Sequence, residues 1–469
     1  MSQAIATMVY ALGILGLFWL DRDREARTST ALWIPVTWVL LAGSRMVSLW
    51  LQVGTDVESP DQYLEGSPLD RLVLTGLLVA GIIVLVRRGR QVGTLLRANG
   101  PIFLFFIYCG ASVLWSDYPD VAFKRWTKAL GDLVMVLIVL TDLDPAAAVK
   151  RLLSRASFLI VPLSILLIKY YPDLGRAYAP WTWTPVYTGV TTNKNLLGMI
   201  CMILGLGSAW RLLPAFPGGQ SARRAGPLIA HSALLAMVLW LFWMANSVTS
   251  LSCFLLAVGL MVAMSMPALA RKPAALHLLV AAVLSVSFSA LFLNLGTGLV
   301  EDMGRDPTLT GRTALWDRLL GMTAGPLFGT GFESFWLGDR LKKLWSIYWW
   351  HPNEAHNGYL EVFLNLGWMG LALLAVVMVT GYRNVVGAFR RDPQAGRLGV
   401  AYFVVAAAYN FTESGFRMMN PVWIAFLLAI MAVPETPPRE GPNMSARVHP
   451  EKRCANLPAG RTHIYEEVV

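Results

Sequence analysis

A histidine at the edge of a long apolar run is the first residue of this sequence that could do chemistry. The stretch HNGYLEVFLNLGWMG, residues 356–370, opens with His356 and Asn357 and continues as an apolar segment. A neutral imidazole, with an ordinary pKa of about 6.5, can take a proton from a hydroxyl as that hydroxyl attacks. The alternative is structural: Asn357 caps the start of a helix, and His356 only precedes it.

Basic residues come before this histidine in the same stretch of chain. They are Arg312, Arg318, Arg340, Lys342 and Lys343. A guanidinium stays charged and binds phosphate oxygens in a bidentate fork. One base and one phosphate-binding arginine are the minimum for moving a sugar from a lipid diphosphate to a hydroxyl. Because a diphosphate is already a good leaving group, the sequence predicts neither a metal ion nor another cofactor.

The composition predicts that these residues belong to a membrane protein. The chain has 469 residues, of which 55% are hydrophobic and 14% are charged. Soluble domains carry about 25% charged residues. The net charge of +10 is spread over loops between apolar runs, which argues against a nucleic-acid partner. We expect an all-α, polytopic transmembrane bundle of about 12–13 helices over residues 1–433.

The expected helices follow from apolar segments close to the length of about 20 residues that crosses a bilayer. Thirteen segments can be drawn, at 3–20, 31–53, 69–86, 100–116, 127–141, 156–170, 195–213, 228–246, 251–270, 274–296, 357–381, 398–412 and 420–433.

The basic residues of the loops predict the orientation of the bundle. Six alternate loops from 21–30 to 382–397 hold 19 Lys and Arg, and residues 434–469 add five more. On the other side, 54–68 and 247–250 hold none, 117–126 holds two, 169–194 three and 413–419 one. Since cytoplasmic loops carry the excess of positive charge, the polar, Pro-rich tail 434–469 is expected to be cytoplasmic and disordered. The amino terminus is expected outside, in a multi-pass protein of a bacterial inner membrane.

This orientation places the one long loop, about 297–356, on the outer, periplasmic face. Loops of this length inside a compact protein are usually functional. The segment 312–321 has apolar residues at helical spacing and is expected to form an amphipathic helix on the membrane surface. We expect turns at Gly329 and Gly331 in the stretch that follows.

Several motifs resemble the O-antigen ligase and exopolysaccharide polymerase family. The run from His356 fits His-Asn, nine residues, Gly, two residues, Gly. The stretch GRTALWDRLLGMTAGPLFGTGFESFW resembles the family's segment with an Arg-Thr-x-x-Trp start. TTNKNLLGM (191–199) and NFTESGF (410–416) resemble two further elements. The resemblance covers about 190–425, with the motifs in the expected order.

This resemblance implies a helical, lipid-dependent glycosyltransferase. It implies metal-independent transfer of a glycan from undecaprenyl diphosphate at the periplasmic face, in lipopolysaccharide or exopolysaccharide biosynthesis. His356 would be the base and Arg312 a diphosphate ligand, with the lipid-linked glycan, membrane lipid and other polysaccharide-assembly proteins as partners.

One departure from the family pattern concerns a short outer turn, ANSVTSLS (245–252), where ligases often carry an Arg. Lys194 or Arg417 would then supply the missing charge. The departure favours the polymerase branch slightly over the ligase branch.

Other candidates for binding the diphosphate or the substrate are Lys194, Arg417, Arg176 and Asn357. Each has a structural alternative. Lys194 would anchor a helix end at the interface, Arg417 would pair with the nearby Glu413, and Arg176 would anchor its Tyr- and Trp-rich loop.

Two other classes of function remain open at this point. A transporter or flippase of a lipid-linked or small polar substrate would favour inverted repeats, broken helices and several intramembrane charges. The sequence shows no evident repeat and few such charges. A structural scaffold in a polysaccharide assembly would leave the His and Arg residues of the long loop without a role.

Overall fold

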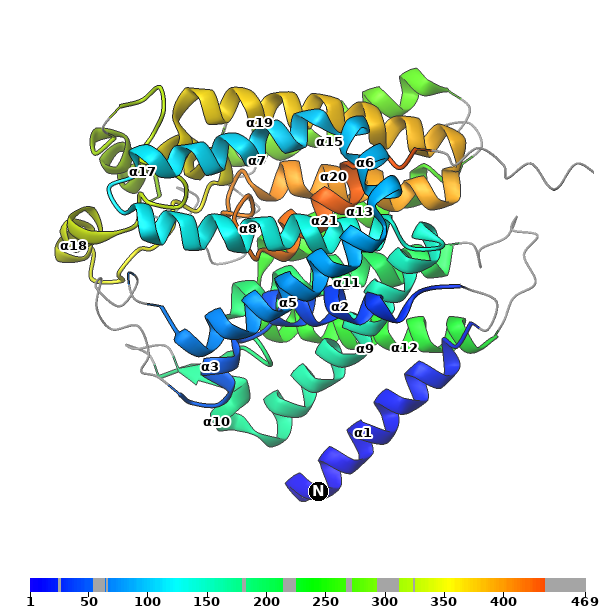
Figure 1. Ribbon diagram of the computed structural model, residues 1–469. Helices are drawn as coiled ribbons and strands as arrows, with labels where there is room; N and C mark the ends of the chain where they lie inside the picture. The colour runs from blue at the N-terminus through cyan, green and yellow to red at the C-terminus, as the bar shows by residue number, and fades with distance from the viewer. Residues whose placement is uncertain are drawn as a thin grey trace, which may run out of the picture. The chain divides into compact units, whose positions relative to one another are not determined.

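The computed structural model describes residues 1–23, 27–53, 64, 66–178, 183–213, 225–266, 272–292, 312–323 and 325–434 (Figure 1). The longer helices in these ranges are α1 (Gln3–Leu20), α2 (Trp33–Ala42), α5 (Pro68–Arg87), α6 (Gly89–Ala98), α7 (Gly100–Ala111), α8 (Pro119–Leu140), α9 (Pro145–Tyr170), α11 (Lys194–Leu212), α12 (Ala225–Ala245), α13 (Val248–Ala263), α15 (Pro273–Phe292), α17 (Arg312–Gly321), α18 (Gly338–Ile347), α19 (Gly358–Arg391), α20 (Pro393–Tyr409) and α21 (Pro421–Ile430). The short elements are α3 (Val47–Trp50), α10 (Pro172–Gly175), the 3-10 turns Thr30–Leu32 and Ser112–Trp115, and the antiparallel pair β1 (Arg176–Tyr178) and β2 (Pro185–Tyr187). The tail 435–469 and residues 293–311 lie outside the described residues.

Each of the thirteen predicted apolar segments overlaps a helix of the described chain. Several helices begin earlier than their apolar run. α9, for example, begins at Pro145 instead of 156, because Asp144 accepts a hydrogen bond from the N–H of Ala147 as the N-cap and a proline suits the first helical position. The apolar runs therefore predict only part of such a helix and miss its polar first turns.

The described chain is that of a polytopic helical membrane protein, as predicted. Six helices are long and apolar enough to cross a bilayer, namely α1, α5, α9, α11, α12 and α19. α6 and α7 together would add a seventh span, although the axis bends by 91° between them. Shorter apolar helices, including α13 and α21, pack with these spans.

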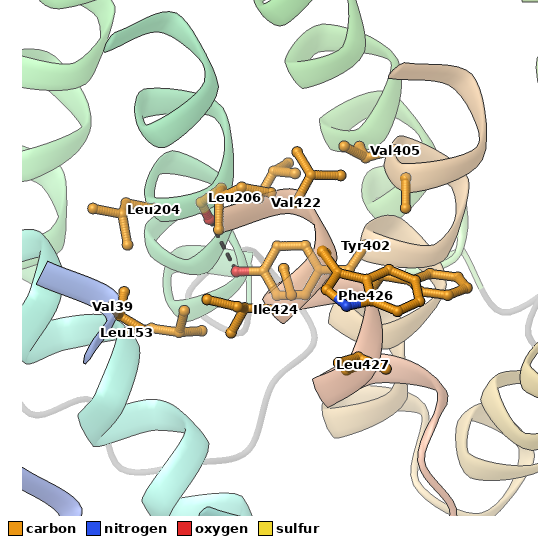
Figure 2. Close-up of a cluster of buried hydrophobic side chains, with 14 of the residues drawn as sticks. Val39, Leu153, Leu204, Leu206, Tyr402, Val405, Val422, Ile424, Phe426 and Leu427 are labelled. Carbon is orange, nitrogen blue, oxygen red and sulfur yellow. Dashed lines mark hydrogen bonds between the residues drawn. The ribbon is translucent and has the colours of Figure 1, made fainter. Parts of the chain in front are cut away.

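In the interior of the bundle, α20 packs against α11 and α21. Figure 2 shows Tyr402 of α20 among aliphatic side chains of the neighbouring helices, with Leu206 and Ile424 close to its ring. Its buried hydroxyl donates a hydrogen bond of 2.9 Å to the carbonyl oxygen of Ile203 in α11. A buried tyrosine hydroxyl needs such a partner, so this bond fixes α20 against α11.

α19 is interrupted at Gly367, which has φ 64° and ψ −164°. The segment 325–331 packs into this break. The N–H of Gly331 donates to the carbonyl oxygen of Asn365 at 2.9 Å, and the N–H of Trp368 donates to that of Pro326 at 2.9 Å. A Cβ at position 367 would lie 2.4 Å from the backbone of Leu327. The loop 325–331 is thus the segment that approaches this glycine closely.

Figure 1 shows α17 and α18 near one end of α19. The long loop forms a small hydrophobic cluster there, which includes Leu364 of α19. The predicted helix 312–321 is confirmed as α17, and the predicted turns at Gly329 and Gly331 occur with φ of 69° and 95°. Leu315 and Leu319 of α17 are fully buried in a cluster with residues of α18. Protein thus covers part of the apolar side of α17, while Leu320 is 49% exposed, and the location of this helix at the membrane surface stays a prediction.

Candidate functional site

His356 and Asn357 form the sharp turn that precedes α19. Asn357 is the N-cap, and its Oδ1 accepts hydrogen bonds of 3.0 Å from the N–H groups of Tyr359 and Leu360. Its Nδ2 donates to the carbonyl oxygen of Phe411 at 3.2 Å. His356 has φ 50°, in the left-handed region that favours glycine. Strained non-glycine residues of this kind cluster at functional sites. Asn357 positions His356, and contact of Asn357 with substrate stays a prediction.

Two carboxylates face the same nitrogen of the His356 ring. Nδ1 lies 3.2 Å from Oε1 of Glu354 and 3.5 Å from Oε2 of Glu413. Burial alone lowers the pKa of His356, but the hydrogen bond with Glu413 and the charges of both carboxylates raise it above its ordinary value. Among the described residues, the ion pairs and hydrogen bonds of this ring all involve Nδ1. Nε2 is the nitrogen that remains for a substrate.

Arg312 joins this arrangement through the second oxygen of Glu413. Its Nη2 lies 3.5 Å from Oε1 of Glu413, while its Nη1 donates a hydrogen bond of 2.6 Å to the carbonyl oxygen of Thr412. The charge of Arg312 opposes protonation of His356. The structure thus brings together the two residues on which the predicted chemistry depends, with one carboxylate between them.

Arg417 belongs to the same cluster, with partners that differ from the expected one. The sequence suggested a pair with Glu413, but Nη1 of Arg417 lies 3.2 Å from Oε2 of Glu354, and Nη2 lies 3.5 Å from Oε2 of Glu333. The pairing is corrected accordingly, because Glu413 is already shared by Arg312 and His356.

The guanidinium of Arg417 stays protonated in this position. Burial alone lowers the pKa of its guanidinium, but nearby carboxylates outweigh this and raise the pKa above its ordinary value. Arg417 therefore stays charged and compensates the acidic residues around it.

Glu361, one turn into α19, ties the loops around His356 together. One of its carboxylate oxygens accepts a hydrogen bond of 2.5 Å from the N–H of Ala355, and the other accepts one of 2.9 Å from Nε1 of Trp336. Ser414 donates to it at 3.4 Å. These bonds join Ala355 and Trp336 of the long loop to Ser414 of the turn 410–420. Glu361 therefore holds together the segments that surround His356.

Lys194 and Arg176 lie at another place. Lys194 is the first residue of α11 and lines a cavity of about 760 Å³ together with Tyr187 of β2. Arg176 donates from Nε to the carbonyl oxygen of Ile168 at 2.9 Å, and its guanidinium lies 5.6 Å from the centre of the Tyr187 ring. Within the described part of the chain, no hydrogen bond or ion pair joins either side chain to the His356 cluster. Their role in diphosphate binding stays a prediction.

The His356 cluster also contains the residues of the described chain that could ligate a metal ion. One ligand atom each from Glu354, His356 and Glu413 lie within 4.8 Å of one another. Arg312 and Arg417 already pair with these two carboxylates. Their guanidiniums supply the positive charge that a divalent cation would bring, so this donor set is a poor fit for a resident metal ion.

Sequence reasoning missed the acidic half of the site. Glu333, Glu354 and Glu361 were not among the predicted residues, and Glu413 was considered only as a partner for Arg417. Two signals were present. Glu361 interrupts an apolar run, where ionisable residues are expensive and usually functional. Glu354 stands two residues before His356, at a spacing that allows contact only in a tight turn, and a turn of this kind is not visible in the sequence.

The chain is similar to a known family and to one known exopolysaccharide protein. Residues 221–375, which include Arg312 and His356, match the O-antigen ligase family. The exopolysaccharide production protein ExoQ of Rhizobium meliloti (strain 1021) is 26% identical over 302 residues, which cover 60% of this chain and 64% of that protein. The chain therefore matches less than two thirds of the length of this relative.

These findings define the class of the protein: it is a polytopic helical membrane protein. The family match and the relative support the O-antigen ligase and exopolysaccharide family, so the resemblance drawn from the motifs is confirmed.

Proposed function

We propose that the protein transfers a glycan from undecaprenyl diphosphate to an acceptor hydroxyl at the periplasmic face of a bacterial inner membrane. The observation that carries this proposal is the arrangement at His356, whose Nδ1 faces Glu354 and Glu413 while Nε2 remains for a substrate. A histidine with one nitrogen held by a carboxylate is oriented to act as a general base through the other.

The reaction follows from this geometry. The acceptor hydroxyl approaches Nε2 of His356, which takes its proton as the oxygen attacks the anomeric carbon of the donor. A new carbon–oxygen bond forms, and the bond from that carbon to the diphosphate breaks. The lipid diphosphate leaves with the bonding electron pair. Glu354 and Glu413 stabilise the imidazolium that forms, because their negative charges face Nδ1.

Arg312 is proposed as the diphosphate contact nearest to this base. It shares Glu413 with His356, and its side chain is 23% exposed, so part of the guanidinium is accessible to a substrate. The guanidinium would stabilise negative charge on the leaving oxygen without a metal ion.

The polymerase branch of the family is favoured over the ligase branch for this chain. The outer turn 245–252 lacks an arginine. In addition, the relative to which the chain is similar is named for exopolysaccharide production. Deletion followed by analysis of glycans separates the two activities. Accumulation of single lipid-linked repeat units supports polymerisation, whereas loss of glycan from the lipid A core supports ligation.

A transporter or flippase receives less support from the described residues. The charged residues of the site gather in the segments that precede and face the first turn of α19, at one end of that helix. Alternating access requires binding groups near the middle of the membrane.

The decisive experiment is the substitution His356→Ala in the full-length protein, reconstituted with lipid-linked glycan. Product formation should be lost, while the amount of membrane-inserted protein stays unchanged. His351→Ala is a matched control, since His351 stacks on Trp345 at 4.4 Å and belongs to the packing of the loop. Normal product formation by His356→Ala refutes the assignment of the base.

A further inference from the structure

The cavity beside Lys194 has a mostly aromatic and apolar lining. Tyr187 of β2 lines it together with Trp240 and Trp243 of α12, and Lys194 is the one charged residue among its described lining residues. Its volume of about 760 Å³ falls within the range of about 300–1,000 Å³ that small-molecule sites occupy. None of the residues that contact His356 lines it, so this cavity is a second place where a ligand could bind.

Trp243 supplies an aromatic surface to this cavity. The residue is 74% exposed, and in the described chain no hydrogen bond or ring contact engages its indole. Trp240 precedes it by three residues and therefore lies on the same side of α12, with the ammonium of Lys169 at 5.1 Å from its ring centre. A flat ring of this kind can cover the C–H face of a sugar, while its N–H donates to a hydroxyl.

Lys194 supplies a hydrogen-bond donor that the fold does not use. It is the first residue of α11, where the helix dipole disfavours a positive charge. Asn193 already caps this helix, since its Oδ1 accepts a hydrogen bond of 2.8 Å from the N–H of Leu196. Within the described residues, the ammonium of Lys194 has no hydrogen bond or ion pair. Its three N–H groups are therefore available to a ligand.

This combination fits a sugar better than a diphosphate. A diphosphate carries two or more negative charges and is bound by several cationic or N–H donors. Here a single cation lines the cavity, and the nearby Arg176 is engaged by the carbonyl oxygen of Ile168 and the ring of Tyr187. A sugar needs an aromatic surface for its C–H groups and a few polar partners for its oxygen atoms, and the cavity offers both.

The cavity lies at the same end of the helices as the His356 cluster. Gly198 follows Lys194 by one turn of α11, and a Cβ at this position would lie 3.0 Å from Oγ of Ser250 in α13. The side chain of Ser250 is hydrogen-bonded to that of Tyr409, the last residue of α20. The carbonyl oxygen of Tyr409 accepts a hydrogen bond of 3.0 Å from the N–H of Glu413, the residue that faces His356. A glycan that reacts at His356 can therefore extend towards Lys194.

We propose that this cavity binds a sugar unit of the lipid-linked glycan, with the sugar ring stacked on Trp243 and its oxygen atoms hydrogen-bonded to Lys194. The cavity would then select the glycan, whereas the His356 cluster acts on the bond to the diphosphate. This inference rests on the proposed function, because it takes a lipid-linked glycan as the substrate.

The test compares two ligands that differ only in the glycan. Full-length protein in nanodiscs of phosphatidylcholine is titrated with undecaprenyl diphosphate, and separately with undecaprenyl diphosphate that carries the repeat-unit oligosaccharide. In the second ligand a CH₂ group replaces the oxygen between the first sugar and the diphosphate, so no transfer can occur. The wild-type protein should bind the glycan-bearing ligand more tightly than the bare lipid.

Two variants should weaken the binding of the glycan-bearing ligand alone. Trp243→Leu keeps an apolar side chain for lipid but removes the ring, and the dissociation constant should rise about fivefold. Lys194→Gln loses a charged hydrogen bond, and the constant should rise about tenfold. Binding of undecaprenyl diphosphate should stay unchanged in both variants.

The matched controls lie away from the cavity. Trp19→Leu removes a tryptophan that is 72% exposed near the end of α1, and Lys124→Gln removes the charge of an exposed lysine of α8. Both should leave the binding of both ligands unchanged. If Trp19→Leu weakens the glycan-bearing ligand as much as Trp243→Leu does, the tryptophans act only as membrane anchors and the proposal is overturned.

Two further outcomes overturn the proposal. An equal loss of affinity for both ligands in Lys194→Gln would assign this lysine to the diphosphate. Unchanged affinity for the glycan-bearing ligand in both cavity variants would show that no sugar binds there. Failure of the proposed function is distinguishable, since His356→Ala would then form product normally while the difference between the two ligands persisted.

Discussion

The substitution Glu413→Gln tests how the carboxylates around His356 act. Glutamine keeps the size of the side chain and removes its charge. The hydrogen bond and charge of Glu413 raise the pKa of His356, so this pKa should fall in the variant. A general base acts in its neutral form, and activity therefore rises as pH rises through the pKa of His356. In the wild type this acidic limb should lie above pH 6.5, and in Glu413→Gln it should move to lower pH.

The magnitude of the rate loss follows from the distances at Nδ1. Glu413 lies at 3.5 Å and Glu354 at 3.2 Å, both longer than a strong charged hydrogen bond. Each contact should therefore contribute near the low end for charged partners, about 1.5 kcal/mol. Loss of one carboxylate should lower kcat at the pH plateau about tenfold, and loss of both about a hundredfold. The remaining carboxylate still orients the ring in each single variant.

The assay is the rate of glycan transfer by reconstituted protein between pH 5 and 9, with saturating donor and acceptor. Glu354→Gln provides a parallel measurement, and the double variant tests additivity. If both single variants keep the wild-type rate and profile, the carboxylates do not support the base. A shift of the acidic limb to higher pH would contradict the electrostatic argument directly.

The remaining predictions concern the leaving group, the break in α19 and the orientation in the membrane. Arg312→Lys keeps the charge but loses the planar fork, so kcat should fall about tenfold while the protein melts at its usual temperature. Gly367→Ala should lower the melting temperature by several degrees, since it forces a Cβ into φ 64° against a neighbouring backbone; Gly387→Ala on the same helix meets nothing within 4 Å and should be neutral or stabilising. Ser346→Cys, at an exposed position of α18, should react with a membrane-impermeant maleimide added outside the inner membrane, and labelling only after lysis would place this loop in the cytoplasm.

The sequence predicted the helices well because hydropathy and helix caps are local signals. The apolar runs, the helix at 312–321 and the cap at Asn357 each depend on residues within a few positions of one another. The break at Gly367 was missed because a glycine inside an apolar run does not show which segment will fill the gap. That partner, 325–331, lies about 40 residues earlier in the chain.

Only part of the site was predicted, because the sequence shows local patterns and not contacts between distant segments. His356 and Arg312 stood out by residue type and by motif, and the structure places both next to Glu413. The pairing of Arg417 depends on three segments meeting in space, which no local pattern encodes. Lys194 lines a cavity with Tyr187, and Arg176 lies over the ring of Tyr187, so similar residue type alone did not place them with Arg312.

The insertion of 325–331 into α19 has a mechanical consequence. The backbone of this loop is bonded on both sides of Gly367, so the loop and the first turns of α19 must move as one body. Swinging the loop aside would leave these amide and carbonyl groups without their partners, at a cost of about 1–3 kcal/mol for each group that stays buried. His356 directly precedes α19 and is therefore carried by the same body, so in the proposed reaction the lipid-linked sugars would have to move to reach it.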